Sequence, residues 1–406
     1  MPHGRSTCFV SITCVIVVLL LLATMPIFNF TNLNVPLRSN SNNTAGSFSS
    51  ATGNENASKY AVLKSFHSYG SSLGVTFDPS NGYFYVMIQN GILVMNAKND
   101  KVVTKATIYG IGNFPAGIAY DPVNKLLYAV NNLEFLGGNG AVLAINATTL
   151  KTVKTIPVNN QPSFALYNPA GQDIYVSESA SDKIVVINPR TNDITSNITV
   201  GLSPMALAYA PLKGLVYAAD ESSDNVSVID GSTNTVVGNI SVSGGPFDFT
   251  YNPIDKWLYV TERNGVNTYA GTNITAIDTS TNRVVANIDT GYESPQGIVY
   301  DPINGFLFVS IYATTTVLLI NTSDNLVAAK LSVGIDPFYL IYDGFNGHIY
   351  VTCDHPGDSL YVLGIPSPSH SYSSIYSYLA VAATIIAAVA TAGIVIRRRH
   401  RESEQR

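Results

Sequence analysis

The sequence predicts an all-β protein, a seven-bladed β-propeller made of four-stranded antiparallel blades. The first observation behind this prediction is a repeat, in which an aromatic residue stands two places before a proline and recurs every 42 to 49 residues. The second is a period-two alternation of apolar and polar residues within each copy, in four short segments bounded by Gly, Pro, Asn or Ser. A repeated unit of four short strands is one blade of a propeller, and it buries its apolar face by stacking on its copies.

The repeat recurs seven times, which sets the number of blades. The aromatic residues that mark the copies are Phe77, Tyr120, Tyr167, Tyr209, Tyr251, Tyr300 and Tyr342. Six copies carry the proline, which cannot donate a hydrogen bond to a sheet and therefore ends the first strand, while the seventh has Gly344 there. The composition agrees, because 12% charged residues with 24 Tyr, 31 Gly and 20 Pro are typical of a β-rich, turn-rich chain.

Two further positions recur within the copies. An Asn or Asp after the third segment should begin the turn into the fourth strand by bonding its own backbone; these residues are Asn96, Asn146, Asn188, Asp230, Asp278 and Asn321. An aromatic residue in the second segment should fill the gap between neighbouring blades; these residues are Tyr85, Tyr128, Tyr175, Tyr217, Tyr259, Phe308 and Tyr350.

The ends of the repeat region predict how the ring closes. The seventh copy stops at residue 364, after its third segment, while residues 60–66 (YAVLKSF) form an extra strand pattern ahead of the first copy. Placing this strand on the outside of the last blade completes that blade and covers its open edge. We therefore expect a propeller over residues 60–364, closed by strand 60–66.

The second segments carry a family resemblance. Tyr259-Val260-Thr261 and Tyr350-Val351-Thr352, with Tyr175-Val176-Ser177 close to them, resemble the signature of YVTN-family β-propeller repeats, known from archaeal surface-layer and cell-surface proteins. The resemblance covers residues 60–364 and implies a cell-surface structural or interaction protein. The Asn that usually follows this signature is kept only at Asn131, so the resemblance carries over no ligand role.

Both flanks predict a membrane. Residues 1–30 contain the apolar run 8–28 and read as a signal peptide or a signal anchor, and residues 31–59 are a polar linker. Residues 365–378 form a second linker before an uncharged transmembrane helix at 379–396 and a basic tail at 397–406. The arginines of this tail favour a cytoplasmic location, which places the propeller outside the cell.

Charge and sequons bear on the partners of this extracellular part. Between the two apolar runs lie 16 basic and 25 acidic residues, a net charge of −9, which disfavours nucleic acid. We expect the membrane and other envelope proteins, surface proteins or glycans as partners. Sequons inside the propeller make six asparagines candidates for glycosylation: Asn146, Asn197, Asn225, Asn239, Asn273 and Asn321.

Catalytic motifs are scarce. The sequence has no P-loop, no G-x-S-x-G elbow and no H-E-x-x-H motif. Cys353, Asp354, His355 and Asp358 can be read either as metal ligands or as an exposed turn. We expect a non-enzymatic binding or scaffold protein without a cofactor; the alternative is an extracellular propeller enzyme such as a metal-dependent hydrolase or lactonase.

A ligand face is predicted where the second and third strands join. The two long insertions, 131–140 and 262–273, fall there, and function often collects on such loops. Just before this loop, Asn131 and then three carboxylates, Glu178, Asp220 and Glu262, stand at equivalent positions of consecutive blades, with Arg263 beside them and Asp354 after the same position of the seventh blade. The three carboxylates could form an arc that holds Ca²⁺ or meets a cationic partner, or each could cap its own loop in water.

Overall fold

A computed structural model describes residues 56–366 except 68, 71, 112–114, 133–139, 159–160, 264–270 and 356. The predicted signal segment, the start of the first linker, the C-terminal apolar run and the basic tail lie outside the described residues. Within the described part of the chain, no helix has the length and apolar character needed to cross a membrane.

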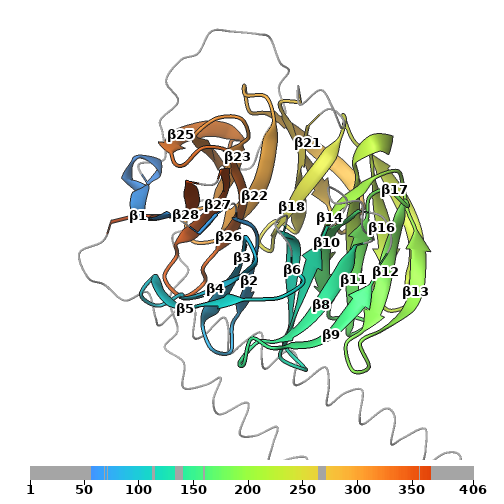
Figure 1. Ribbon diagram of the computed structural model, residues 1–406. Helices are drawn as coiled ribbons and strands as arrows, with labels where there is room; N and C mark the ends of the chain where they lie inside the picture. The colour runs from blue at the N-terminus through green and yellow to red at the C-terminus, as the bar shows by residue number, and fades with distance from the viewer. Residues whose placement is uncertain are drawn as a thin grey trace, which may run out of the picture. The chain divides into compact units, whose positions relative to one another are not determined.

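The described residues form seven four-stranded antiparallel sheets arranged as the blades of a propeller, which confirms the predicted fold (Figure 1). The first three blades consist of β2 (Ser72–Asp78), β3 (Tyr83–Ile88), β4 (Gly91–Asn96) and β5 (Lys101–Thr107), then β6 (Pro115–Asp121), β7 (Leu126–Asn131), β8 (Ala141–Asn146) and β9 (Thr152–Pro157), then β10 (Pro162–Asn168), β11 (Asp173–Glu178), β12 (Lys183–Asn188) and β13 (Asp193–Thr199).

The next three blades follow the same order. They consist of β14 (Pro204–Ala210), β15 (Leu215–Asp220), β16 (Asn225–Asp230) and β17 (Thr235–Ser241), then β18 (Pro246–Asn252), β19 (Trp257–Glu262), β20 (Asn273–Asp278) and β21 (Arg283–Asp289), then β22 (Pro295–Asp301), β23 (Phe306–Ile311), β24 (Thr316–Asn321) and β25 (Leu326–Ser332). A short 3-10 helix, η3 (Glu221–Ser223), follows β15.

The seventh blade is built from both ends of the ring. It contains β26 (Pro337–Tyr342), β27 (Ile349–His355) and β28 (Asp358–Gly364), and its outer strand is β1 (Ala61–His67), which pairs antiparallel with β28 from Ala61 opposite Gly364 to His67 opposite Asp358. Figure 1 shows the blue β1 beside the red β28. The closing strand was predicted at 60–66 and begins one residue later. Ahead of it, the 3-10 helix η1 (Ala57–Lys59) falls within the predicted linker.

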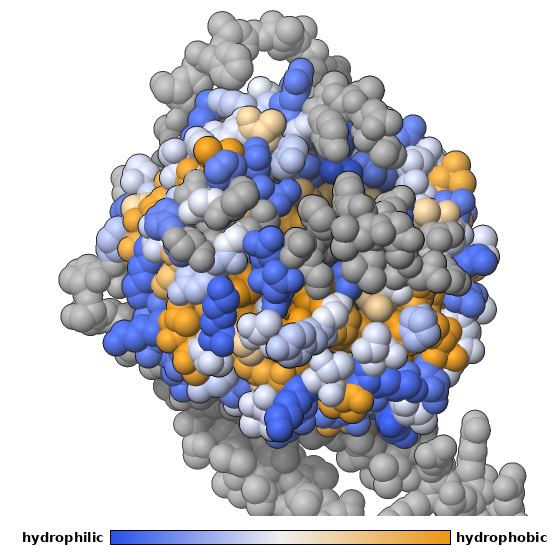
Figure 2. Space-filling model, viewed as in Figure 1, coloured by the Kyte–Doolittle hydropathy of each residue, from blue (hydrophilic) through white to orange (hydrophobic). Residues whose placement is uncertain are grey.

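The hydrophobic core is a ring of seven layers, one between each pair of neighbouring blades. In the first layer, for example, Tyr85 and Met87 of β3 pack with Leu127 and Leu143 of the second blade. Six more clusters fill the remaining junctions, including the one between the last blade and the first. Each repeat thus buries its apolar face against the next. At the surface, hydrophobic residues are interspersed with hydrophilic ones on the face seen in Figure 2.

The residue before the repeated proline, or before Gly344 in the seventh blade, has a role that the sequence analysis missed. In six blades its side-chain oxygen accepts a hydrogen bond from the backbone N–H two residues later, which makes an Asx turn at the end of the first strand. These residues are Asp78, Asp121, Asn168, Asn252, Asp301 and Asp343. The predicted turn residues after the third strand are confirmed, because all six accept the same kind of bond, as Asn96 does from Lys98.

The two ends of each strand define two faces of the ring. We call the face with the loops between second and third strands and the connections between blades the loop face; backbone bonds such as Val242 N–H to the Asp224 carbonyl join these two kinds of loop. The opposite face carries the turns between first and second strands and between third and fourth strands, joined by bonds such as Thr279 N–H to the Lys256 carbonyl. We call it the turn face.

Candidate functional site: the central cavity and the loop face

The first strands of the blades line a central cavity of about 150 Å³. One position of these strands, the third residue, is small in four blades and large or charged in three; its residues are Gly74, Gly117, Phe164, Ala206, Asp248, Gly297 and Tyr339. Glycine is needed at two of these places because a Cβ on Gly117 would lie 2.7 Å from the Phe164 Cα, and one on Gly297 would lie 2.1 Å from the Phe338 carbonyl oxygen. The small residues let neighbouring first strands approach closely, and the larger ones give the cavity its chemistry.

Asp248 supplies a carboxylate to the cavity. Its side chain is buried, and its two oxygens accept hydrogen bonds from the backbone N–H groups of Phe249 at 2.9 Å and Ile298 at 3.2 Å. Burial raises the pKa of Asp248 to about 7, although these two bonds favour the charged form. The sequence analysis did not single out Asp248; the signal would have been an acid at a position that is small in most blades.

Arg263, a predicted site residue, is buried and bridges two blades on the loop face. Its Nε donates a 2.9 Å hydrogen bond to Glu221 of the fourth blade, and its second guanidinium nitrogen pairs with the same carboxylate. The guanidinium carbon also lies 3.7 Å from the ring centroid of Phe247, a cation–π contact. Burial raises the pKa of Glu221 and Arg263 opposes this shift. The negative charge of Glu221 is therefore paired with the guanidinium of Arg263.

Aromatic rings cluster around the loop-face end of the first strands. Phe338 packs edge-on against Phe247, Tyr312 and Tyr339, with ring centroids 5.8, 6.0 and 4.8 Å apart. Tyr339 also lies parallel to Phe247 at 6.4 Å and contacts Phe164 across the cavity at 6.0 Å. The loop-face end of the first strands is therefore packed with aromatic rings, and the paired guanidinium of Arg263 lies against one of them, Phe247.

Three more tyrosines lie on connections between blades of the same face. Tyr109 is 90% exposed. Tyr69 and Tyr292 each lie under a lysine ammonium, with Lys105 Nζ at 5.4 Å and Lys330 Nζ at 4.5 Å from the ring centroids. Large aromatic side chains that stay accessible on one face are typical of protein interfaces.

The predicted arc residues stand at the ends of their second strands, as expected, but they are buried. Asn131, Glu178, Asp220 and Glu262 each lie opposite the first residue of the neighbouring strand, as Glu262 does opposite Pro246. Two of them bond the connection that enters their own blade: Asn131 donates to the Gly110 carbonyl, and Glu262 accepts from Ser243 N–H. Asp220 instead accepts from the backbone N–H and the hydroxyl of Ser227, whose oxygen accepts a bond from Gly201 N–H in the connection. Glu178 accepts a 2.7 Å bond from the Ser181 hydroxyl.

Two of these acids keep one oxygen without a hydrogen bond among the described residues, Asp220 Oδ1 and Glu262 Oε2. Burial raises the pKa of Asp220 to about 7 and raises the pKa of Glu262, against hydrogen bonds from Ser227 and Thr275 that favour the charged forms. Across residues 56–366, apart from the gaps, no group of three or more His, Cys, Asp or Glu side chains could hold a metal ion. These acids are therefore buried, and each is hydrogen-bonded within its own blade or to the connection that enters that blade.

The seventh-blade candidates follow the same backbone pattern. Cys353 is a buried free thiol within β27, opposite Pro337, and Asp354, which is partly exposed, donates its backbone N–H to the Asp336 carbonyl at 2.9 Å. Asp354 thereby joins β27 to the connection entering its own blade.

Of the six candidate glycosylation sites in the propeller, Asn197 and Asn239 are exposed, whereas Asn146, Asn225, Asn273 and Asn321 are only partly exposed. Asn197 and Asn239 lie on β13 and β17, the outer strands of the third and fourth blades. A glycan on either would project from the rim of the ring, away from both faces.

These features define the chain as a seven-bladed β-propeller with an aromatic loop face. A structure of hydrazine synthase from Kuenenia stuttgartiensis, a propeller protein, is similar to it with a TM-score of 0.59 and 19% identity, over 72% of this chain and 94% of that chain. A likeness at this identity shows the shared fold alone. No family model matches the sequence, and no curated protein matches it.

Proposed function

We propose that this protein is a membrane-anchored, extracellular β-propeller that acts as a binding or scaffold protein of the cell surface, similar in kind to YVTN-repeat surface-layer proteins. One observation carries the proposal. Both ends of the ring lie on the turn face, where Ala61 pairs with Gly364, while Tyr109, the one exposed aromatic side chain among the described residues, lies on the loop face with the partly exposed Tyr69 and Tyr292. Anchors joined to these two ends would leave the loop face free to meet a partner.

The chemistry of the loop face favours a protein or glycan partner. Its accessible tyrosines supply large, stiff contact areas of the kind that dominate interface energetics. Among the described residues its exposed charges balance, with Lys105, Lys183 and Lys330 against Asp224, Asp289 and Glu293. A balanced aromatic surface favours neutral or mixed-charge envelope components.

The topology can be tested on intact cells with a tag after Arg406. External protease should digest the propeller and spare the tag, because the basic tail is proposed to remain in the cytoplasm. Protection of the propeller would contradict the proposed location.

The binding face can be tested with a photo-reactive amino acid in the full-length protein on living cells. Placed at Tyr109, it should cross-link to an envelope protein or glycan. The matched control is Leu326, which is 53% exposed on the outer strand β25, away from the loop face. Equal cross-linking from both positions would show that the loop face is not the binding face.

The alternative, a metal-dependent hydrolase, has its own test. Metal analysis of the purified full-length protein would support the hydrolase alternative if it found one tightly bound ion per chain. A protein without a stoichiometric ion, together with selective cross-linking at Tyr109, would favour the binding role.

A further inference from the structure

The turn face carries exposed aliphatic side chains at equivalent places in four blades. They stand directly after the proline that follows the first strand: Val123 is 55% exposed, Leu212 48%, Ile254 64% and Ile303 43%. In three of these turns an Asx bond to the aliphatic residue's own backbone N–H holds it at the tip, as Asn252 holds Ile254 at 2.9 Å. Four such side chains around one end of the ring form an interrupted apolar collar, because the fourth, fifth and sixth blades are neighbours and the second blade stands apart from them.

Cationic side chains are interleaved with this collar. Lys125, Lys213 and Lys256 lie in the same turns as three of the aliphatic residues, and seven further exposed cations lie on the hairpins, on the closing strand or just before it. The ten exposed cations of the turn face are Lys59, Lys64, Lys98, Lys101, Lys125, Lys151, Arg190, Lys213, Lys256 and Arg283.

Acidic residues are fewer on this face. Its exposed acids are Asp193, which pairs with Lys154, Asp255 and Asp324, and its partly exposed acids are Asp173, Asp230 and Asp278. A chain that is acidic between its apolar runs therefore presents one face with an excess of positive charge. The balanced charges of the loop face show that this excess is particular to the turn face.

The same face gives rise to both flanking segments. The described ring ends at residue 366, and the predicted transmembrane helix begins at residue 379, so residues 367–378 join them. Twelve extended residues reach at most about 40 Å, at roughly 3.3 Å each. A helix anchored in a bilayer would therefore hold the turn face within reach of that bilayer.

We propose that the turn face docks on a lipid bilayer surface that carries anionic headgroups. Lysine and arginine side chains are drawn to such a surface, and aliphatic side chains between them can enter the boundary between headgroups and acyl chains. The inference rests on the anchored topology proposed above, and it adds that the propeller lies on the membrane with its loop face outward. The electrostatic part of this docking weakens as salt is raised.

The test uses the full-length protein in lipid nanodiscs of phosphatidylcholine alone or mixed with phosphatidylglycerol. A fluorophore is attached at Ile254→Cys on the turn face or, as a control, at Glu293→Cys on the loop face, both in a Cys8→Ser, Cys14→Ser background because Cys353 is buried. Quenching by lipids that carry a spin label reports contact with the bilayer. We expect quenching at position 254 to exceed that at 293 several-fold in the anionic discs, and to fall as salt is raised.

Two triple charge reversals separate docking from simple tethering. Lys125→Glu, Lys213→Glu and Lys256→Glu together should abolish the excess quenching at position 254. The matched control, Lys105→Glu, Lys183→Glu and Lys330→Glu on the loop face, makes the same change in net charge and should leave it intact.

The outcomes distinguish this inference from the proposed function. Protein that joins the disc but shows equal quenching at both positions, or responds alike to both triple variants, overturns the docking and leaves the anchoring standing. Protein that does not join the disc overturns the anchoring and, with it, the docking.

Discussion

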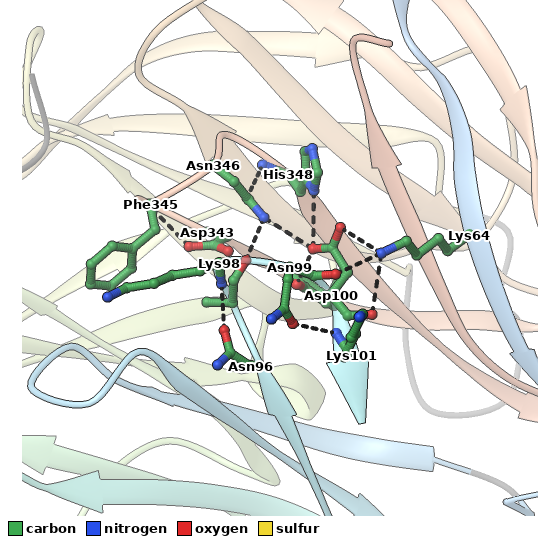
Figure 3. A network of polar contacts seen from close by, with 12 residues as sticks. Lys64, Asn96, Lys98, Asn99, Asp100, Lys101, Asp343, Phe345, Asn346 and His348 are labelled. Carbon is green, nitrogen blue, oxygen red and sulfur yellow. Dashed lines mark hydrogen bonds and ion pairs between the residues drawn. The ribbon is translucent and has the colours of Figure 1, made fainter. Parts of the chain in front are cut away.

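The Tyr350 hydroxyl donates a 2.6 Å hydrogen bond to the carboxylate of Asp100, 250 residues earlier, across the junction where the last blade meets the first. The same carboxylate accepts bonds from Asn346 at 3.0 Å and His348 at 3.1 Å, and pairs with Lys64 of the closing strand at 3.2 Å (Figure 3). One buried acid therefore joins the first blade, the last blade and the strand that closes the ring.

The bond from Tyr350 to Asp100 has a charged acceptor, whereas the equivalent bond at other junctions has a neutral asparagine as its acceptor. Tyr128 and Tyr217 donate to Asn192 and Asn282, which occupy the same left-handed place in the hairpin of the next blade. At the closing junction the acceptor is Asp100. Burial opposes its ionisation, but the hydrogen bonds from His348 and Tyr350 prevail and lower the pKa of Asp100 to about 2.

Tyr350→Phe should lower the free energy of unfolding by about 1–2 kcal/mol, because it removes a buried bond to a charged acceptor. The matched control is Tyr259→Phe, since the Tyr259 hydroxyl has no hydrogen-bond partner among the described residues. Removing the Tyr259 hydroxyl should therefore change the free energy of unfolding only slightly. Denaturant unfolding of the two full-length variants and the wild type measures these changes. Equal losses of unfolding free energy in the two variants would show that the bond contributes nothing.

Asp100→Asn should destabilise the fold by about 2 kcal/mol at neutral pH, the value of a pKa lowered by some two units. The folded pKa lies below the unfolded one, so this stability is present above about pH 4 and is lost as the pH falls through 2. The difference between wild type and variant should therefore shrink in acid. Asp193→Asn, which breaks an exposed ion pair with Lys154, should not affect stability measurably at any pH.

The sequence predicts the blades well because the information is local. Strand alternation, the turn residues after third strands and the missing fourth strand of the last copy can all be read from short stretches. Whether a side chain between two blades is buried or paired cannot be read in this way, since it depends on a neighbour some 40 residues away in the sequence. Glu221 and Arg263 show this: each has the sequence context of an exposed loop, and their pairing depends on how the fourth and fifth blades meet. Asp248 was missed because only comparison of all first strands marks it as unusual.

Phe308 illustrates a departure from the repeat that the structure explains. The following blade has no hairpin between its third and fourth strands, because β1 comes from the other end of the ring, and so it offers no acceptor like Asn192. Instead the ring of Tyr60 packs on Phe308 at 5.0 Å, and the Tyr60 hydroxyl bonds Asp301. Phe308 is therefore the aromatic residue suited to a junction without that acceptor.

Phe308→Tyr should destabilise the protein by about 1–3 kcal/mol, although six other blades carry tyrosine at this position, because it buries a hydroxyl without its usual partner. Thermal unfolding of the full-length variant measures the effect. A gain in stability would contradict the explanation and indicate that the closing blade provides an acceptor.

The last prediction concerns Asp220, whose buried carboxylate has one oxygen bonded by the Ser227 hydroxyl at 2.6 Å and the other without a hydrogen bond among the described residues. Its folded pKa of about 7 lies above the unfolded value, so its contribution to stability is fully present below about pH 4 and is lost as the pH rises through 7. Asp220→Asn keeps the acceptor for Ser227 and removes the charge, and should exceed wild type in stability at pH 8 by on the order of 1–3 kcal/mol. Chemical denaturation between pH 4 and 8 should show a shallower decline for Asp220→Asn, and shallower still when Asp343, another buried acid with a pKa raised to about 7, is also changed to Asn. Parallel curves for wild type and both variants would show that these carboxyls are not held protonated by burial.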